Sequence, residues 1–391
     1  MATLLLLLIY IMFIGLGIPD SALGAAWPAM YQDIGASIGQ ANYITIVASF
    51  CTAIMSYFSA KLINKFGTGA VAALSTTLTL LGLVGTALSH SLWFSVLCSI
   101  PAGLGAGAID SAMNNYVAIH YKPTHMNFLH SFYGVGVIAS PLLLSLFIGG
   151  ENGWRNGYMV VFFIQVAITA ISFIALPLWK KVNKLQTEEE QFTPKTLKLK
   201  ELVKIKQVPI AWVVFFASVG LEFTCGIWGA SYLVKSQGLS EELAARYLTL
   251  YYVGITVSRF ISGIVATKIK ERPIIFTGFI IVGIAMALLI LPVPPVVKAI
   301  GLLCVGLGNG PTFPNLCCLT PKYFGKEISQ SIMGTQMVAC NLGICLMPPL
   351  FGLFADYVSI DAYPYYLTAL FVVMVVFGII YDRKTAKFRN A

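Results

Sequence analysis

The chain has 391 residues, of which 58% are hydrophobic and only 10% charged, and its net charge is +9 at neutral pH. Soluble globular domains carry about 25% charged residues, so this composition excludes an ordinary soluble protein and indicates a polytopic membrane protein. In such a protein lysine and arginine set the orientation in the bilayer, so we expect membrane lipids as partners and no nucleic acid.

The hydropathy pattern predicts an all-α membrane protein with twelve transmembrane helices, at about 20 residues per span. The apolar N-terminus lacks a basic region and runs on through Asp20 to Trp27, so it is interpreted as the first span rather than a signal peptide. The predicted spans are 4–30, 41–60, 69–89, 92–121, 126–149, 156–180, 208–234, 243–267, 273–292, 296–319, 329–353 and 362–381.

One long polar segment, residues 181–207, divides the chain nearly in half and is predicted to be a cytoplasmic linker. It separates an N-terminal six-helix bundle, residues 1–180, from a C-terminal six-helix bundle, residues 208–391. With both termini in the cytoplasm, most lysines and arginines lie in inner loops, as the positive-inside rule requires. The favoured location is the bacterial inner membrane. The basic residues left outside are few: Arg155, Lys235, Arg246 and Lys298.

The first predicted span contains an acid, Asp20, directly after a proline. Pro19 removes a backbone donor and loosens the helix, so polar access at this depth becomes possible. Gly17 and Gly24 lie on the same face as Asp20, because residues three and four apart are neighbours on a helix.

The fourth predicted span carries Asp110 near its middle. A charged side chain at the centre of a bilayer costs roughly 2.5 to 3.5 kcal/mol, so it usually faces a protein interior or an aqueous cavity. Gly103 and Gly107 allow a neighbouring helix or a ligand to approach closely, and Asn114 extends the polar face by one turn. The alternative is an acid that only joins two helices by a hydrogen bond.

The fifth predicted span begins with His130 and Tyr133 on one face. A histidine there could relay protons or line the path of a substrate. An interfacial imidazole that reaches toward the headgroups is the alternative.

The second half repeats the first at an offset of 203 residues, since the glycines of Gly103–Gly107 meet those of Gly306–Gly310. Transporters built from such repeats bind their substrate near the midplane, between the halves. The side chains of the two repeats differ at the acid, because the residue equivalent to Asp110 in the second half is Phe313.

The C-terminal half supplies a third acid, Glu222 in span seven. Trp228 on the same span could stack on a sugar ring, although ordinary helix packing explains it equally well. Arg259 in span eight could pair with a carboxylate or reach the interface, and we favour a structural role for it. Several amides in spans ten and eleven together suggest a polar cavity, although a single buried amide usually joins helices: Asn309, Asn315, Gln336 and Asn341.

The whole chain resembles the major facilitator superfamily, and within it the fucose-galactose-glucose proton symporter branch. The resemblance rests on Asp20, on the glycine-rich stretch with its acid at Gly105 to Asn115, on Gly-Leu-Glu at Gly220 to Thr224, and on Val253 to Gly263. It implies that Asp20 and Asp110 are the two membrane carboxylates used by sugar permeases and that Glu222 matches an acid of the glucose-transporting members. At Asp110 the branch usually has Glu, so this carboxylate reaches one methylene less far.

The leading hypothesis is a secondary transporter, not an enzyme, that imports a monosaccharide or related polar solute with protons by alternating access. Asp110 has the first proton-coupling role, and Asp20 and Glu222 are further coupling acids; sodium coupling is the alternative, since carboxylates serve either cation. An exporter or lipid flippase is the second hypothesis. We expect a monomer without cofactor or metal, since the cysteines show no ligand spacing. The predicted substrate-binding residues are Asp20, Asn114, His130, Glu222, Trp228, Asn309, Asn315, Gln336 and Asn341.

Overall fold

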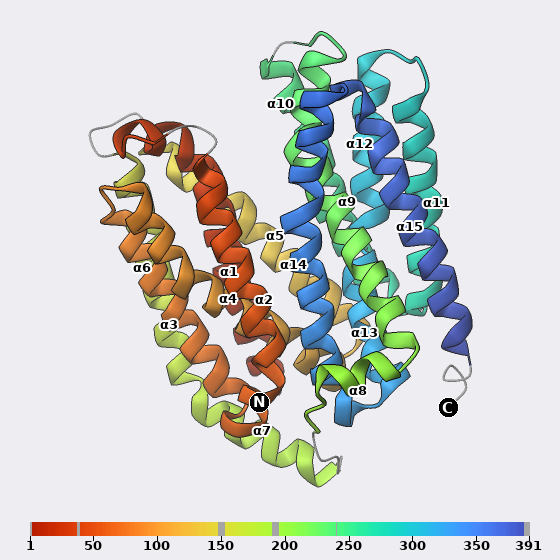
Figure 1. Ribbon diagram of the computed structural model, residues 1–391. Coiled ribbons are helices and arrows are strands. Elements are labelled where there is room, and N and C mark those ends of the chain that lie inside the picture. Colours follow the sequence, from red (N-terminus) through yellow and green to blue (C-terminus); the bar gives the residue numbers. More distant parts are fainter. Residues whose placement is uncertain (1, 37–39, 148–152, 190–194, 240, 387–391) are drawn as a thin grey trace. The chain divides into compact units, whose positions relative to one another are not determined.

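The computed structural model describes residues 2–36, 40–147, 153–189, 195–239 and 241–386, which form helices without a strand (Figure 1). The helices are α1 (Ala2–Asp33), α2 (Ala41–Phe66), α3 (Thr68–Ala87), α4 (Leu92–His120), α5 (Pro123–Ser145), α6 (Gly153–Ile174), α7 (Leu176–Glu189), α8 (Leu199–Lys204), α9 (Gln207–Lys235), α10 (Glu241–Val265), α11 (Glu271–Ile290), α12 (Pro295–Asn309), α13 (Thr312–Phe324), α14 (Lys326–Tyr357) and α15 (Tyr363–Lys384), with a 3-10 turn, η2 (Ile360–Ala362).

Each predicted span is occupied by helix. Within the described residues, eleven helical stretches are long and apolar enough to cross a membrane, and α5 occupies the one remaining predicted span, 126–149. The predicted span at 156–180 is divided between α6 and α7, and the span at 296–319 between α12 and α13. The all-α class predicted from composition is therefore confirmed.

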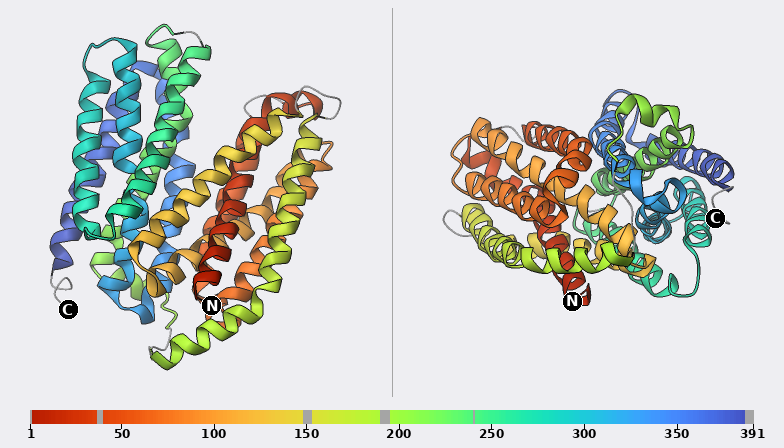
Figure 2. Two further views of the ribbon diagram at one scale, coloured as in Figure 1. Left: turned by 180° about the vertical axis from the view of Figure 1, so that it is seen from behind. Right: turned by 90° about the horizontal axis from the view of Figure 1, so that it is seen from below.

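The chain forms two compact units that do not follow chain order throughout. Unit 1 comprises Met1–Tyr116, Leu129–Thr196 and Lys326–Gly334, and unit 2 comprises Val117–Phe128, Leu197–Gly325 and Thr335–Ala391. Each unit therefore contains one short segment from the other half of the sequence. In unit 1, α3 packs against α6; in unit 2, α12 packs between α10 and α11, and α15 packs against α9 (Figures 1 and 2).

Each unit has its own apolar core. In unit 1, Ile18, Leu83 and Trp154 bring α1, α3 and α6 together around fully buried Ala22. In unit 2 the core contains aliphatic side chains and buried aromatic rings, which include Tyr251 of α10, Phe351 of α14 and Tyr363 at the start of α15.

The offset of 203 residues recurs in the helix contacts themselves. A Cβ on Gly103 would lie 2.2 Å from the carbonyl oxygen of Ala48 on α2, and a Cβ on Gly306 would lie 2.2 Å from that of Tyr251 on α10. Ala48 and Tyr251 are separated by the same offset as the two glycines. Only glycine permits such close approach of two backbones, so the duplication predicted from sequence extends to the packing.

The repeats share a hydrogen-bond acceptor but differ in its donor. In unit 1, Ser56 Oγ on α2 donates to the carbonyl of Gly107 at 3.1 Å. In unit 2, Arg259 Nε on α10 donates to the carbonyl of Gly310 at 3.0 Å. Ser56 and Arg259 are counterparts in the repeat, as are Gly107 and Gly310.

Two prolines explain why the tenth span is divided into α12 and α13. Pro311 has no N–H for the carbonyl four residues earlier, and Pro314 likewise has none for the carbonyl of Gly310. The Gly310 carbonyl is thus available to a side chain, which Arg259 supplies. Broken helices of this kind occur at the ion and substrate sites of transporters.

The predicted linker contains helical structure, and it belongs to unit 1 up to Thr196 and to unit 2 from Leu197 on. It includes most of α7 and all of α8, while residues 190–194 lie outside the described part. Beyond them, Lys195 N–H donates to the carbonyl of Glu327 at 2.8 Å, and Asn64 Nδ2 donates to Thr196 Oγ1 at 2.8 Å. These bonds join the linker to the ends of α2 and α14. Two of the basic residues that the positive-inside rule places in the cytoplasm, Lys387 and Arg389, lie outside the described residues.

Asp33, at the end of α1, joins three segments of unit 1. Its carboxylate accepts hydrogen bonds from Trp154 Nε1 at 3.0 Å and from Arg155, whose other terminal nitrogen donates to the carbonyl of Ser89 at 2.8 Å. Burial opposes ionisation of Asp33, but the bonds from Trp154 and Arg155 outweigh it and lower the pKa of the carboxyl below its usual range. Arg155 is therefore a paired charge.

The Asp33 contacts predict a pH-dependent stability. A lowered folded-state pKa contributes stability that is present above about pH 4, the unfolded value, and is lost as the pH falls through the folded value. Because the Asp33 side chain is 44% exposed, solvent limits the effect to roughly 0.2–1 kcal/mol. We expect Asp33→Asn to lower the thermal stability of the detergent-solubilised protein at pH 7, and the gap from wild type to close below about pH 4. A gap that stayed constant down to pH 3 would contradict this role.

Candidate functional site

The first acid, Asp20, lies on a face of α1 that is partly open. Tyr133 on α5 donates its hydroxyl hydrogen to Asp20 Oδ2 at 2.7 Å. The same two helices touch through glycine, because a Cβ on Gly17 would lie 2.2 Å from the carbonyl oxygen of Tyr133. One turn beyond Asp20, a Cβ on Gly24 would meet no atom within 4 Å. Asp20 is therefore both bonded and accessible.

The second acid, Asp110 on α4, begins a chain of hydrogen bonds. Asn114 Nδ2 donates to Asp110 Oδ1 at 2.8 Å, and Asn114 Oδ1 is 2.8 Å from His130 Nε2 on α5. His130 packs edge-on against Phe13 of α1, with ring centroids 5.6 Å apart. Asn114 and His130 are buried, and Asp110 is partly exposed. The amide thus joins a carboxyl group to an imidazole within an apolar helix pair.

Both acids of unit 1 are connected to α5, since Tyr133 bonds Asp20 directly and His130 is linked to Asp110 through Asn114. Together with Tyr133, Asn114 and His130, they line facing parts of α1, α4 and α5. Four residues predicted from sequence as site residues, Asp20, Asp110, Asn114 and His130, are therefore brought together. Such a group can exchange protons and can accept hydrogen bonds from a polar solute.

The third acid, Glu222 on α9, is paired with a cation in unit 2. Arg259 Nη2 lies 3.1 Å from Glu222 Oε1 and 3.4 Å from Oε2. Asn309 Nδ2 lies 3.5 Å from Glu222 Oε2, and Ser218 Oγ donates to Asn309 Oδ1 at 3.1 Å. We favoured a structural role for Arg259 from the sequence. In the structure Arg259 also contacts Glu222, a predicted site residue.

Two of the predicted amides lie in closed contacts. Asn315 is fully buried, and its amide donates to Ser262 Oγ, to Asn127 Oδ1 and to the carbonyl of Pro311. Gln336 is also fully buried and accepts a hydrogen bond from Thr320 at 2.9 Å. Their polar groups therefore face protein.

The remaining two predicted residues are also engaged with their own helices or neighbours. Asn341 is 9% exposed and donates to the carbonyl of Met337 one turn earlier. Trp228 donates its indole N–H to the carbonyl of Pro348 at 2.8 Å, and its ring packs against Phe351. In this structure Trp228 joins α9 to α14.

Two contacting residues were not predicted as site residues. Tyr133 was seen only as a neighbour of His130, although it is the residue that bonds Asp20. Ser218, one turn before Glu222 and on its face, supports Asn309. The helical spacing of Ser218 from Glu222 could have identified it.

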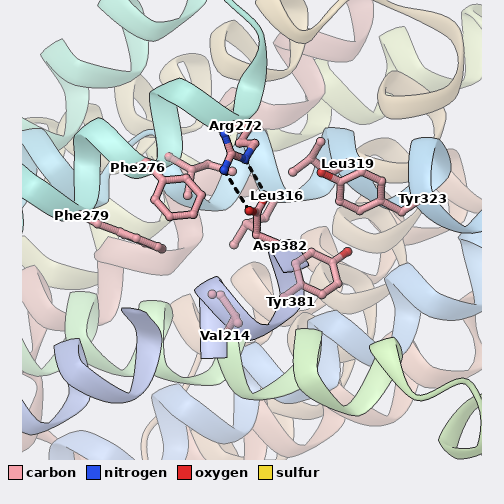
Figure 3. Close-up of a pocket in the computed structure, with 11 residues that line it drawn as sticks. Val214, Arg272, Phe276, Phe279, Leu316, Leu319, Tyr323, Tyr381 and Asp382 are labelled. Carbon is pink, nitrogen blue, oxygen red and sulfur yellow. Dashed lines mark hydrogen bonds and ion pairs between the residues drawn. The ribbon is translucent and has the colours of Figure 1, made fainter. Parts of the chain in front are cut away.

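A small cavity lies elsewhere in unit 2, between α9, α11, α13 and α15 (Figure 3). Its walls are mostly apolar and aromatic. The charged side chains in its lining, Arg272 and Asp382, form an ion pair. Arg272 Nε and Nη2 donate to the two carboxylate oxygens of Asp382 at 2.7 and 3.1 Å. This cavity is separate from the acids described above.

Comparison with known proteins decides the family. The family model described as Major Facilitator Superfamily matches residues 5–348 and 247–390. The chain belongs to this superfamily. Its members are membrane transporters rather than enzymes, and the match together with the helices above confirms the twelve-helix fold predicted from sequence.

Individual relatives are distant. The chain is 25% identical over 390 residues to Bypass of stop codon protein 6 of Saccharomyces cerevisiae, covering 90% of this chain and 77% of that protein. It is 20% identical to the glucose/mannose transporter GlcP of Bacillus subtilis, covering 82% of this chain and 80% of that one. The crystal structure of the superfamily transporter FucP in the outward conformation matches with a TM-score of 0.76 at 16% identity, covering 96% of this chain and 98% of that chain.

Proposed function

We propose that this superfamily transporter imports a monosaccharide or a related polar solute together with protons, by movement of its two halves that alternates access to the site. The observation that carries the proposal is the hydrogen-bonded chain from Asp110 through Asn114 to His130. A carboxyl group and an imidazole joined within an apolar helix pair can take up and release a proton without water around them.

The roles follow from the contacts. Asp110 carries the coupling proton, because its carboxylate is held by a neutral amide rather than by a permanent cation. Asp20, on the open face of α1, accepts hydrogen bonds from solute hydroxyls in addition to the bond from Tyr133. The proposal includes no cofactor or metal, a monomeric protein, and a plasma membrane with both termini in the cytoplasm.

The test is uptake into proteoliposomes that contain the purified protein. Labelled glucose, mannose, fucose and galactose are offered separately under an inward proton gradient, with protein-free liposomes and a protonophore as controls. We expect saturable accumulation of at least one hexose, abolished by the protonophore. Accumulation driven equally well by a sodium gradient would replace the proton with sodium. Expulsion of amphiphiles without hexose uptake would overturn the proposal in favour of an exporter.

A further inference from the structure

Arg259 has an unusual place for a cation. It lies on α10 in an apolar span and is 6% exposed, and its partner Glu222 lies near the middle of α9. An ion pair removed from water is favourable only when its geometry is good and its remaining hydrogen-bonding groups are satisfied. The geometry of this pair therefore bears on its role.

The guanidinium of Arg259 is only partly used. Nε is bonded to the Gly310 carbonyl, and both contacts with Glu222 come from Nη2, at 3.1 and 3.4 Å. Among the described residues, Nη1 has no hydrogen-bond partner. The Glu222 side chain is 17% exposed, so the pair is not fully enclosed.

The protein makes a better arginine pair elsewhere. Arg272 presents two nitrogens to the two oxygens of Asp382 (Figure 3), which is the fork geometry that guanidinium and carboxylate groups prefer. Arg259 meets Glu222 through a single nitrogen. Nη1 and Nη2 form the fork of Arg259. Glu222 contacts only Nη2, so Nη1 has no contact with this carboxylate.

We infer that Arg259 binds the carboxylate of an anionic solute and that Glu222 occupies part of this site until the solute arrives. This inference rests on the proposed function and narrows its substrate class to polyhydroxy monocarboxylates, that is, sugar acids. The solute carboxylate takes the fork of Arg259, and Asn309 donates to one of its oxygens. The fork recognises the planar, two-oxygen geometry of a carboxylate and has no matching interaction with a neutral sugar.

Displacement of Glu222 requires a proton. An unpaired carboxylate is unfavourable in this low-dielectric place, so Glu222 takes one proton from the aqueous phase when the solute anion replaces it. One negative charge and one proton enter together, so the net charge of the site is unchanged. Among the residues that the structure describes, the other titratable groups near Glu222 are the phenols of Tyr251 and Tyr252 and the thiol of Cys225.

Calorimetry of the purified full-length protein with D-glucuronate, using D-glucose as the neutral comparison, tests the inference. Titrations in two buffers of different ionisation enthalpy give the number of protons taken up per ligand bound. We expect wild type to bind glucuronate with uptake of about one proton. Glu222→Gln removes the internal competitor and its titrating group, so it should bind glucuronate at least as tightly and without proton uptake.

Two further variants separate a binding role from a structural one. Arg259→Lys retains the charge but lacks the fork and should bind glucuronate at least tenfold more weakly. The double variant Arg259→Gln/Glu222→Gln removes the pair without leaving a buried charge, and it should melt near the wild-type temperature while losing glucuronate binding. Wild-type affinity in the double variant, or equal proton uptake by wild type and Glu222→Gln, would overturn the inference.

Uptake distinguishes failure of the inference from failure of the proposed function. Proton-driven accumulation of glucose without glucuronate would refute the carboxylate site and leave the transporter proposal intact. Accumulation of neither compound or of any other hexose, in liposomes that contain correctly folded protein, would refute both.

Discussion

Replacing Asp110 with asparagine is expected to abolish proton-driven accumulation of the solute while leaving solute exchange in place. Asparagine has the same shape and can still accept the hydrogen bond that Asn114 Nδ2 gives to Oδ1, so this bond within α4 survives. It cannot carry a proton. We expect accumulation under a pH gradient to fall at least tenfold, whereas counterflow of labelled against unlabelled solute, which needs no net proton movement, continues.

A matched control is Glu201→Gln, which removes a carboxylate from α8 outside the membrane spans but keeps an oxygen for the Lys198 N–H. It should accumulate solute as wild type does. If Asp110→Asn also accumulates solute normally, the coupling proton resides elsewhere and the acid of α4 only joins helices. Loss of counterflow together with accumulation would indicate a binding or folding defect.

The largest effect on stability is expected from adding one methyl group at Gly103 or Gly306. In Gly103→Ala the new Cβ would lie 2.2 Å from the Ala48 carbonyl oxygen, and in Gly306→Ala it would lie 2.2 Å from that of Tyr251. Neither backbone oxygen can rotate away, so the two helices must separate. Overpacking of this kind costs about 1–3 kcal/mol or more, and the better helix propensity of alanine offsets at most about 1 kcal/mol of it.

Thermal unfolding followed by circular dichroism in detergent measures this effect. Gly283→Ala on α11 is the control, because the nearest atom to its Cβ would be 3.5 Å away, an ordinary contact. We expect lower melting temperatures for the Gly103 and Gly306 variants, and for Gly283→Ala an unchanged or slightly higher one. Melting at the wild-type temperature in all three variants would mean that the two close helix crossings do not limit stability.

The span pattern and the duplication could be predicted from sequence because they depend on hydropathy and on residue spacing, which can be read without knowing which helices are neighbours. Hydropathy over about 20 residues locates a span without knowledge of its neighbours. The offset linking Gly103 to Gly306 carried over to their contacts with Ala48 and Tyr251. The division of α12 from α13 was not predicted, since residues 296–319 were predicted to be one span, although Pro311 and Pro314 were a local signal for it.

Side-chain partners were harder to predict. In a helix that is apolar on all sides, the sequence does not indicate which face packs against which neighbouring helix. Asn315 and Gln336 were predicted to bind substrate, and in the structure their side chains are hydrogen-bonded to Asn127 and Thr320, which the sequence did not indicate. Arg259 and Glu222 are far apart in sequence, so their pairing follows only from the packing of α9 and α10. The acids of α1 and α4 could be singled out because a charged residue within an apolar span is conspicuous in the sequence alone.

The equivalence of Ser56 and Arg259 has an evolutionary consequence. In both repeats, a carbonyl oxygen one turn after the glycine of a helix crossing accepts a hydrogen bond from the adjoining helix. Only the donor side chain differs between the repeats. A mutation from a hydroxyl to a guanidinium at that place would have kept the architectural bond while installing a permanent positive charge in one copy alone. Gene duplication thus provided a position where new chemistry could arise without dismantling the scaffold that holds it.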